Sequence, residues 1–424
     1  MEKSELDKKI KIFTIGDHPL SPSGVGTQSR YMIEGLLKTG KYQFISFGGA
    51  VEHPDHTPQK TDQYEDDWII YPIDGYGTQE QVRSAIRTHK PDILWFMTDP
   101  RFYGWLWEIE NEIRPLMPMV YYHVWDNFPP PKFNRSFYLS NDIIATISKV
   151  TDDVVKAVAP EVRREYVPHA VDTNVFKKLD PKIISEFKKQ NLAQIGKGKI
   201  VFFWNNRNAR RKMSGSVLWW FKEFLDEVGH DKAMLLMHTD PKDIHGPDLE
   251  HVVRELGLNN DQVLFSAGKY PAEMLAILYN LADCTINIAD AEGFGLATLE
   301  SLSCEAPVIV SMTGGLQQQV TDGENWFGFG IEPSSKAVIG SQDVPYIYED
   351  RVNREDFMDA LRKFINLSPE ERDEMGRLGR EYVLKEYNLE KYTERWDDLM
   401  TDIYETYGSW ENRKGYNNWE LMVL

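Results

Sequence analysis

Short apolar runs alternate with segments of helical spacing over the first 150 residues. Apolar residues at Met32, Ile33, Leu36 and Leu37 have the three- and four-residue spacing that predicts a helix over 28–38, and a second helix is predicted over 79–89. Between and after them the apolar runs predict strands over 11–16, 44–47, 69–71, 93–97, 119–124 and 143–147. This alternation predicts a mostly parallel sheet that helices cover on both faces.

A second alternation of the same kind begins after a loop over 167–176 and a charged helical segment over 181–190. Its predicted strands span 199–204, 233–238, 263–266, 284–289 and 307–310, and its predicted helices include 214–228 and 271–281. The pattern therefore predicts an α/β protein of two tandem Rossmann-like, doubly wound domains that face a central cleft.

We divide the chain into a first domain over 1–172, a second domain over 173–390 and a C-terminal segment over 391–424. The stretch 369–407 reads as two helices rich in charged and aromatic residues. It forms either a solvated amphipathic C-terminus or a final helix that crosses back to the first domain.

Glycine-containing or basic turns follow three predicted strands, at 21–27, 205–212 and 290–295. Ligands of doubly wound sheets bind at the carboxyl ends of the strands, so these turns are the candidate binding loops. In the last turn, Glu292-Gly293-Phe294-Gly295 leads into a helix that carries Glu300. Backbone N–H groups of Phe294 and Gly295 and the positive end of that helix would attract an anion, and the two glutamates would bind hydroxyl groups. A phosphate beside hydroxyl groups describes a nucleotide sugar.

The second turn concentrates positive charge in an otherwise acidic chain, with Arg207, Arg210, Arg211 and Lys212. Fixed cations at a strand end would stabilise the negative charge of a leaving diphosphate. A solvated basic loop is the alternative interpretation when this stretch is read alone.

The first domain offers weaker candidates. Gly24 and Gly26 would let the backbone approach a diphosphate, unless they only make a tight turn. Asp17 and His18 precede them and are candidate acceptor contacts. His123, near the end of a predicted strand, could contact the transferred sugar or be structural. Trp125 and the neighbouring tryptophans could stack on an acceptor, although packing is the simpler interpretation.

Composition narrows the classes of partner. The net charge is −18, which argues against an extended nucleic-acid surface. The two cysteines, Cys284 and Cys304, lie in predicted core segments and point to a reducing, cytoplasmic setting, with a peripheral position at a membrane left open. No apolar run approaches the length of a transmembrane segment or a signal peptide. The histidines, cysteines and aspartates show no metal-ligand spacing, so we expect no metal site and no cofactor beyond the sugar donor.

At this point the chain resembles the retaining glycosyltransferases of family 4, which have the GT-B fold. The residues that carry the resemblance are Ser23-Gly24-Val25-Gly26, the strand 143–148, the turn 167–172 with Phe176, Arg207-Asn208 with Arg211-Lys212, the loop 263–268, and Glu292-Gly293-Phe294-Gly295-Leu296 with Glu300 and Gly314-Gly315. The resemblance covers about residues 11–400 and is closest in the second domain.

The resemblance implies roles for several residues. Arg207 and Lys212 would bind the diphosphate, Glu300 the ribose and Glu292 the transferred sugar, with His123 near that sugar. Ser266 would lie in the base-binding loop, and Leu296 would join the donor site. The sugar would be transferred with retention by same-face attack and without metal. The acceptor stays open among a glycan, a lipid head group, a small molecule and a modified nucleic acid.

Three positions depart from the family pattern, because Ala170, Met213 and Glu305 stand where glycine is usual. They would alter loop geometry without removing a donor contact. Other readings also remain: a nucleotide-sugar epimerase, a phosphorylase, and a non-catalytic nucleotide-sugar-binding protein on the same architecture. A nicotinamide-dependent oxidoreductase is disfavoured, because the loop at 24–26 lacks the third glycine at the required offset.

Overall fold

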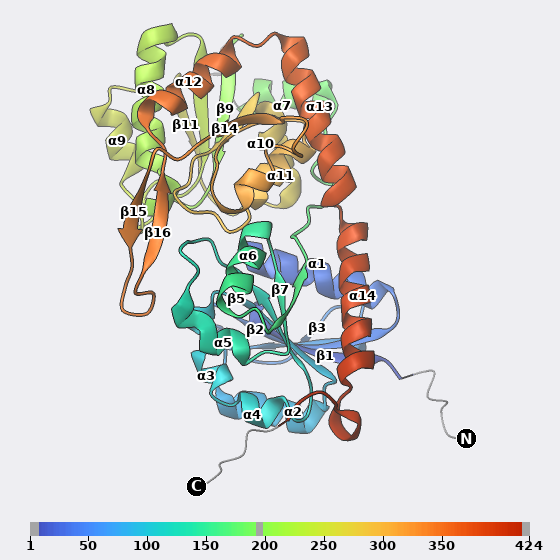
Figure 1. The fold of residues 1–424 in the computed structure, drawn as a ribbon. Helices are drawn as coiled ribbons and strands as arrows, with labels where there is room; N and C mark the ends of the chain where they lie inside the picture. Colours follow the sequence, from blue (N-terminus) through green and yellow to red (C-terminus); the bar gives the residue numbers. More distant parts are fainter. Residues whose placement is uncertain (1–7, 192–197, 418–424) are drawn as a thin grey trace.

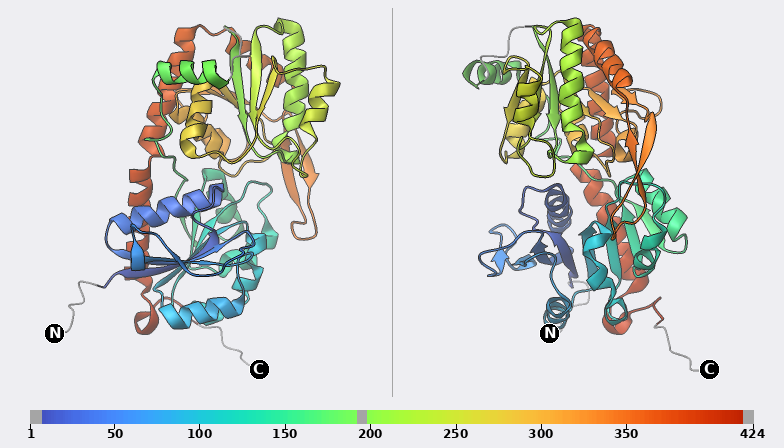
Figure 2. Two further views of the ribbon diagram at one scale, coloured as in Figure 1. Left: turned by 180° about the vertical axis from the view of Figure 1, so that it is seen from behind. Right: turned by 90° about the vertical axis from the view of Figure 1, so that its left-hand side faces the viewer.

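The computed structural model describes residues 8–191 and 198–417 as two α/β domains stacked one above the other (Figure 1). Each domain is built around its own sheet, and helices cover both faces of each sheet (Figures 1 and 2). The N-terminal and C-terminal residues 1–7 and 418–424, which our division places in the first domain and the C-terminal segment, lie outside the described residues.

The first domain holds an eight-stranded sheet in the order β3-β4-β2-β1-β5-β6-β7-β8. Its strands run parallel except β3, which is antiparallel to β4. The strands are β1 (Ile10–Asp17), β2 (Tyr42–Gly49), β3 (Gln59–Lys60), β4 (Trp68–Pro72), β5 (Ile93–Thr98), β6 (Met119–His123), β7 (Ile143–Thr146) and β8 (Arg163–Tyr166). The helices are α1 (Gly24–Lys38), α2 (Gln79–His89), α3 (Gly104–Trp107), α4 (Glu110–Ile113), α5 (Arg135–Leu139) and α6 (Lys149–Val158).

The second domain holds a six-stranded, all-parallel sheet in the order β11-β10-β9-β12-β13-β14. The strands are β9 (Ile200–Asn205), β10 (Ala233–His238), β11 (Val263–Ser266), β12 (Cys284–Asn287), β13 (Val308–Ser311) and β14 (Gly328–Ile331). The helices are α7 (Pro181–Asn191), α8 (Ser214–Val228), α9 (Leu249–Glu255), α10 (Ala272–Leu281), α11 (Leu296–Ser303) and α12 (Arg354–Ile365).

Burial explains why the central strands read as unbroken apolar runs. Every residue of β5 and β6 is buried, because a parallel sheet with helices on both faces leaves no solvated side. The predicted parallel architecture of two doubly wound domains is confirmed, and the strand bounds differ from the predicted ones by at most a few residues.

Two long helices close the chain. α13 (Pro369–Glu386) runs along the second domain, and α14 (Leu389–Tyr407) continues down the first, where it packs on α1 (Figure 1). Trp396 of α14 is fully buried, with its ring 4.9 Å from that of Tyr122 and 6.0 Å from that of Trp95. α14 therefore completes the core of the first domain.

One hairpin of the second domain lies outside the six-stranded sheet. β15 (Ser335–Ile339) and β16 (Ile347–Arg351) form an antiparallel hairpin that reaches from the second domain toward the first (Figures 1 and 2). The charged and aromatic mixture of 335–351 gave no clear apolar run, and the sequence analysis did not predict it.

Candidate functional site

The glycine–glutamate turn lies where the sequence pattern places it, between β12 and α11. Gly295 is the N-cap residue of α11 at φ 93°, a left-handed conformation that favours glycine, and a Cβ there would lie 2.6 Å from Leu316. No side chain caps α11. The amide of Thr298 donates to the carbonyl oxygen of Gly295 at 3.0 Å, and no capping side chain competes with an anionic ligand for the other N–H groups at this helix start.

The basic loop after β9 is held against this turn. Asn208 is fully buried, and its side chain accepts a hydrogen bond from Ser214 Oγ at 2.7 Å and donates one to the carbonyl oxygen of Pro247 at 2.8 Å. The amide of Asp290 donates to the carbonyl oxygen of Arg211 at 2.8 Å. The Asn208 bonds hold the basic loop on the second domain, and the Asp290 bond joins it to the turn.

Lys212 and Glu292 are joined by an ion pair at the centre of this arrangement. Burial acts to raise the pKa of Glu292, but the neighbouring charges of Lys212 and Arg211 hold that pKa below its usual value. Burial lowers the pKa of Lys212, although Glu292 opposes that shift. The guanidinium of Arg211 lies 3.3 Å from Asp126 of the first domain and donates to the carbonyl oxygen of Ala291 at 2.5 Å. The turn thus carries a compact set of alternating charges.

Arg207 points elsewhere. Its guanidinium is 62% exposed and lies 2.7 Å from Asp243, and it also contacts His245. Arg207 and Lys212, which the sequence analysis groups as one diphosphate site, are therefore not brought together in this conformation.

Glu300 lines a cavity of about 650 Å³ between the two domains. Its carboxylate accepts a hydrogen bond from Tyr279 Oη at 2.7 Å, and burial raises its pKa to about 7. On the opposite wall Gly24 lies so near α11 that a Cβ would be 3.3 Å from Leu296 Cδ1. Leu296 and Gly24 thus share this cavity with Glu300.

Gly24 and Gly26 belong to a helix and not to an open loop. α1 begins at Gly24, because the side chain of Ser23 accepts a hydrogen bond from the Gly26 amide and caps the helix. A Cβ on Gly26 would lie 2.7 Å from the carbonyl oxygen of His18, so this glycine permits close packing and does not line the cavity.

His123 is buried in the first domain. Its Nε2 lies 2.8 Å from Tyr138 Oη and its Nδ1 lies 3.1 Å from Tyr121 Oη, and burial lowers its pKa to about 3. Both ring nitrogens of His123 therefore contact tyrosine hydroxyls, and the imidazole is neutral near pH 7. His123 lines none of the three cavities at the domain boundary.

Four further predicted residues, Asp17, His18, Ser266 and Phe294, line neither of the two interdomain cavities. Asp17 accepts hydrogen bonds from Ser23 Oγ at 2.6 Å and Tyr76 Oη at 2.9 Å, and His18 is buried with its Nδ1 accepting from the Leu20 amide. Ser266 Oγ lies 3.1 Å from His238 Nδ1, outside the cavity. Phe294 is buried against His169 at a ring distance of 4.9 Å, which joins the turn to the interdomain segment.

Trp125 lines a second interdomain cavity of about 410 Å³, on the other side of the turn from Glu300. Asp99, Asp126 and Arg210 also line it, together with residues of the β15–β16 hairpin. This cavity was not predicted from the sequence, because its outer wall is the β15–β16 hairpin, which has no clear apolar pattern.

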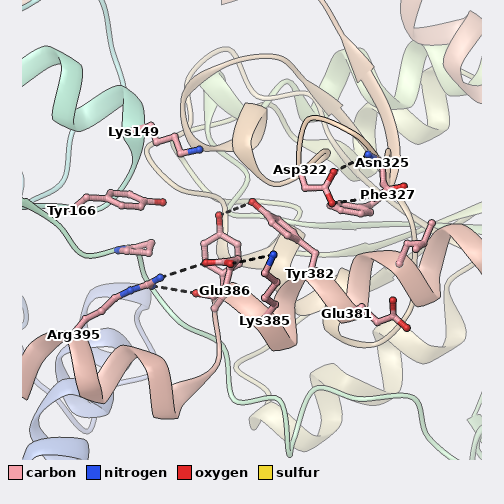
Figure 3. Close-up of a pocket in the computed structure, with 13 residues that line it drawn as sticks. Lys149, Tyr166, Asp322, Asn325, Phe327, Glu381, Tyr382, Lys385, Glu386 and Arg395 are labelled. Carbon is pink, nitrogen blue, oxygen red and sulfur yellow. Dashed lines mark hydrogen bonds and ion pairs between the residues drawn. The ribbon is translucent and has the colours of Figure 1, made fainter.

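A third cavity of about 410 Å³ lies where α13 meets α14 (Figure 3). Tyr382 Oη lies 3.2 Å from Tyr387 Oη and donates to the carbonyl oxygen of Gln318, and Arg395 lies 3.6 Å from Glu386. None of the predicted site residues lines it.

Two structural features are absent from residues 8–191 and 198–417, the part of the chain that the structure describes. Within those ranges no group of three or more His, Cys, Asp or Glu side chains is arranged to hold a metal ion. In the same ranges no helix has the length and apolar content needed to cross a membrane.

Comparison with known proteins identifies one segment of the chain. The family described as "Glycosyl transferases group 1" matches residues 246–382, which include the glycine–glutamate turn and Glu300. The match lies wholly within the second domain. N-acetyl-alpha-D-glucosaminyl L-malate synthase from Bacillus anthracis is 22% identical over 266 residues, which are 62% of this chain. The matched segment spans only 60% of the length of that relative.

Solved structures extend the similarity to the fold of nearly the whole chain. Sucrose-phosphate synthase from Thermosynechococcus elongatus superposes with a TM-score of 0.74 at 16% identity, covering 94% of this chain and 100% of the synthase. HepE from Anabaena, solved in complex with UDP and glucose, superposes with a TM-score of 0.68 at 14% identity, covering 93% of this chain and 100% of HepE. The predicted GT-B fold is confirmed, because both solved proteins superpose on the two domains of this chain.

Proposed function

We propose that this protein is a retaining glycosyltransferase of the family 4 type that moves a hexose or a related sugar from a nucleotide-diphosphate sugar to an acceptor hydroxyl. One observation carries the proposal: Glu300 lines a cavity of about 650 Å³ that both domains build, beside a helix N-terminus and the Lys212–Glu292 pair. A nucleotide-diphosphate sugar carries a ribose, a diphosphate and a sugar in this order. The carboxylate, the helix N-terminus and the ion pair would bind these three groups in the same order. The match of residues 246–382 to the group 1 glycosyltransferase family supports this proposal, and so does the similar fold of HepE, which was solved with UDP and glucose.

The nucleotide would occupy the cavity with its ribose hydroxyls donating to Glu300, as a carboxylate can accept two such bonds. Its diphosphate would lie at the N-terminus of α11, where Lys212 supplies a nearby positive charge. Arg207 would join it after leaving Asp243, a movement that is open to it because its own side chain is 62% exposed. We propose that these side chains neutralise the leaving diphosphate and that no metal is needed.

Glu292 would hold hydroxyls of the transferred sugar. In the proposed step the bond from the anomeric carbon to the diphosphate oxygen breaks, and the acceptor oxygen bonds to the same face of that carbon. The acceptor proton passes to the departing phosphate oxygen, so no general base from the protein is needed. We assign no proton transfer to His123, because both of its ring nitrogens already contact tyrosine hydroxyls.

The test is a thermal-shift and turnover screen with UDP-, GDP-, ADP-, CMP- and dTDP-sugars, first with a chelator and then with added Mg²⁺. The Glu300→Gln variant is measured in parallel. We expect a shift with one nucleotide family, slow release of its diphosphate without metal, and a weaker shift in the variant. NMR of the product's anomeric configuration then tests retention.

Other outcomes would assign another function. A shift with no turnover would indicate a non-catalytic binder, and conversion of one nucleotide sugar into another without diphosphate release would indicate an epimerase. No shift with any nucleotide would overturn the donor site itself.

A further inference from the structure

The β15–β16 hairpin bridges the two domains. Tyr348 of β16 forms an isolated antiparallel bridge with Phe128 of the first domain. Asn127 Nδ2 donates to the carbonyl oxygen of Tyr348 at 2.8 Å. The hairpin belongs to the second domain in sequence, yet it reaches the first domain (Figures 1 and 2), where the amide of Tyr348 donates to the carbonyl oxygen of Phe128.

An apolar anchor fixes the tip of the hairpin. Val344 is 5% exposed and packs with Trp125 and Val154 of the first domain in a small cluster separate from the main cores. Phe133 and Ile347 complete this cluster. A valine at a hairpin tip would otherwise be solvated, so its burial shows that the tip is docked on the first domain.

The base of the hairpin is tied to the basic loop and the turn. Glu349 is 4% exposed and accepts two hydrogen bonds from the guanidinium of Arg210, at 2.7 and 2.8 Å. The amide of Asp350 donates to the carbonyl oxygen of Asp290 at 2.9 Å. The hairpin therefore connects the proposed donor site with the first domain.

The hairpin forms the outer wall of the cavity of about 410 Å³ that Trp125 lines. Three carboxylates and three guanidinium groups line this cavity in equal number, and each carboxylate lies within 3.3 Å of a guanidinium: Asp99 with Arg101, Asp126 with Arg211, and Glu349 with Arg210. The formal charge of the lining is thus zero.

We propose that this cavity binds the acceptor and that the acceptor is an uncharged, hydroxyl-rich compound such as a sugar or a polyol. The proposal rests on the proposed function. The carboxylates can accept hydrogen bonds from hydroxyl groups, and the guanidinium groups can donate hydrogen bonds to them. An anionic acceptor would instead meet three carboxylates with no surplus cation.

The position of the cavity fits this role. Asp126 borders it and contacts Arg211, which binds the carbonyl oxygen next to Glu292. A Cβ on Gly293 would lie 3.5 Å from the carbonyl oxygen of Trp125. An acceptor in this cavity would therefore lie across the turn from the nucleotide, where a hydroxyl can approach the transferred sugar.

Saturation-transfer NMR on the full chain tests the proposal with D-glucose, D-galactose and myo-inositol as neutral probes and glucose 6-phosphate as the anionic match. Val344→Asp undocks the tip, and Val338→Asp, the same change at a position on the hairpin that is 63% exposed, is the control. Arg101→Ala is a second variant, because Arg101 is half exposed and its loss should spare the fold. UDP and GDP binding is measured separately by calorimetry.

We expect at least one neutral probe to bind the wild type and the Val338→Asp control, and to bind Val344→Asp and Arg101→Ala about tenfold more weakly, as for lost contacts in a binding pocket. UDP or GDP binding should be unchanged in all variants. Preference for glucose 6-phosphate, no binding of any neutral probe, or binding that both variants retain would overturn the acceptor proposal. Failure of every nucleotide to bind while a neutral probe binds would instead overturn the donor site alone.

Discussion

Lys212 and Glu292 form a buried ion pair between the basic loop and the glycine–glutamate turn, with side chains only 10% and 14% exposed. The lysine comes from the segment after β9 and the glutamate from the segment after β12, two strands that are neighbours in the sheet. Parallel strands that lie side by side bring their following loops together at one edge. The pair is therefore a direct product of the strand order.

Replacing Lys212 by alanine should reduce both turnover and stability. Loss of the cation beside the leaving diphosphate should reduce donor turnover about 100-fold or more. A buried Glu292 without its partner should lower the free energy of unfolding by about 3–5 kcal/mol. Diphosphate release from the matching nucleotide sugar and urea denaturation measure the two effects.

Two further variants separate these effects. Lys212→Met combined with Glu292→Gln should recover much of the stability, because no buried charge is left unpaired, and should recover no turnover. Lys222→Ala breaks an exposed ion pair with Asp226 on α8 and should cost less than about 1 kcal/mol and no activity. Equal losses in Lys212→Ala and Lys222→Ala would refute a special role for the buried pair.

Glu300 should make nucleotide binding depend on pH near neutrality. Burial raises its pKa to about 7, so the carboxyl is largely protonated at pH 6 and largely ionised at pH 8. The ionised form accepts two ribose hydrogen bonds, so nucleotide affinity should rise over this interval. Calorimetric titration with the matching nucleotide at several pH values should show the rise, and Glu300→Gln should show a flat profile.

The same group should affect stability with the opposite sign. The pKa of Glu300 is raised in the folded state, so its protonated form stabilises the fold. This stabilisation is complete below the unfolded pKa of about 4.5 and is lost as the pH rises through the folded pKa of about 7. Glu300→Gln should therefore gain stability relative to the wild type between pH 6 and pH 8. A constant difference in the free energy of unfolding across that range would contradict the assigned pKa.

The alternation of strands and helices and the parallel character of the sheets were predictable from the sequence, whereas the directions of several side chains were not. β6 is apolar on both faces, so its pattern does not show that His123 shares a face with Tyr121 and points into the core. Arg207 turns toward Asp243 because the loop after β10 offers a carboxylate there, a choice that depends on tertiary structure. The turn, the basic loop and Glu300 were accessible to prediction because a short local pattern defines each of them.

The hairpin at 335–351 was missed for a different physical reason. Its strands alternate only weakly between apolar and polar residues, since one face contacts charged groups of the basic loop and the other is partly solvated. Val344 is buried against the first domain and not against its own hairpin. A contact between domains leaves no periodic trace in the sequence.

Glu305→Gly should stabilise the protein. Glu305 follows α11 with φ 62°, a left-handed conformation that costs a residue with a side chain roughly 1–2 kcal/mol. Glycine removes that cost but adds roughly 0.4–1 kcal/mol of unfolded-state entropy. The free energy of unfolding should rise by roughly 0.5–1 kcal/mol, measured by urea denaturation.

Ala170→Gly is the matched control. Ala170 also stands where the resembled family has glycine, but its φ is not positive. The same substitution should therefore lower stability there, because it adds unfolded-state entropy and removes a buried methyl group without relieving any backbone strain. Equal shifts at both positions would show that backbone conformation does not decide the outcome.

Undocking the hairpin should expose the proposed reaction centre to water. The tip lies over the cavity next to Glu292, and Val344→Asp places a charge in the apolar cluster that holds it. Closed sites limit hydrolysis of their donors by excluding water, so release of free sugar from the nucleotide sugar without an acceptor should rise on the order of tenfold. Val338→Asp should leave the rate unchanged, because that side chain already faces solvent. If both variants hydrolyse the donor at the wild-type rate, the hairpin does not close the site, and water must be excluded by the two domains alone.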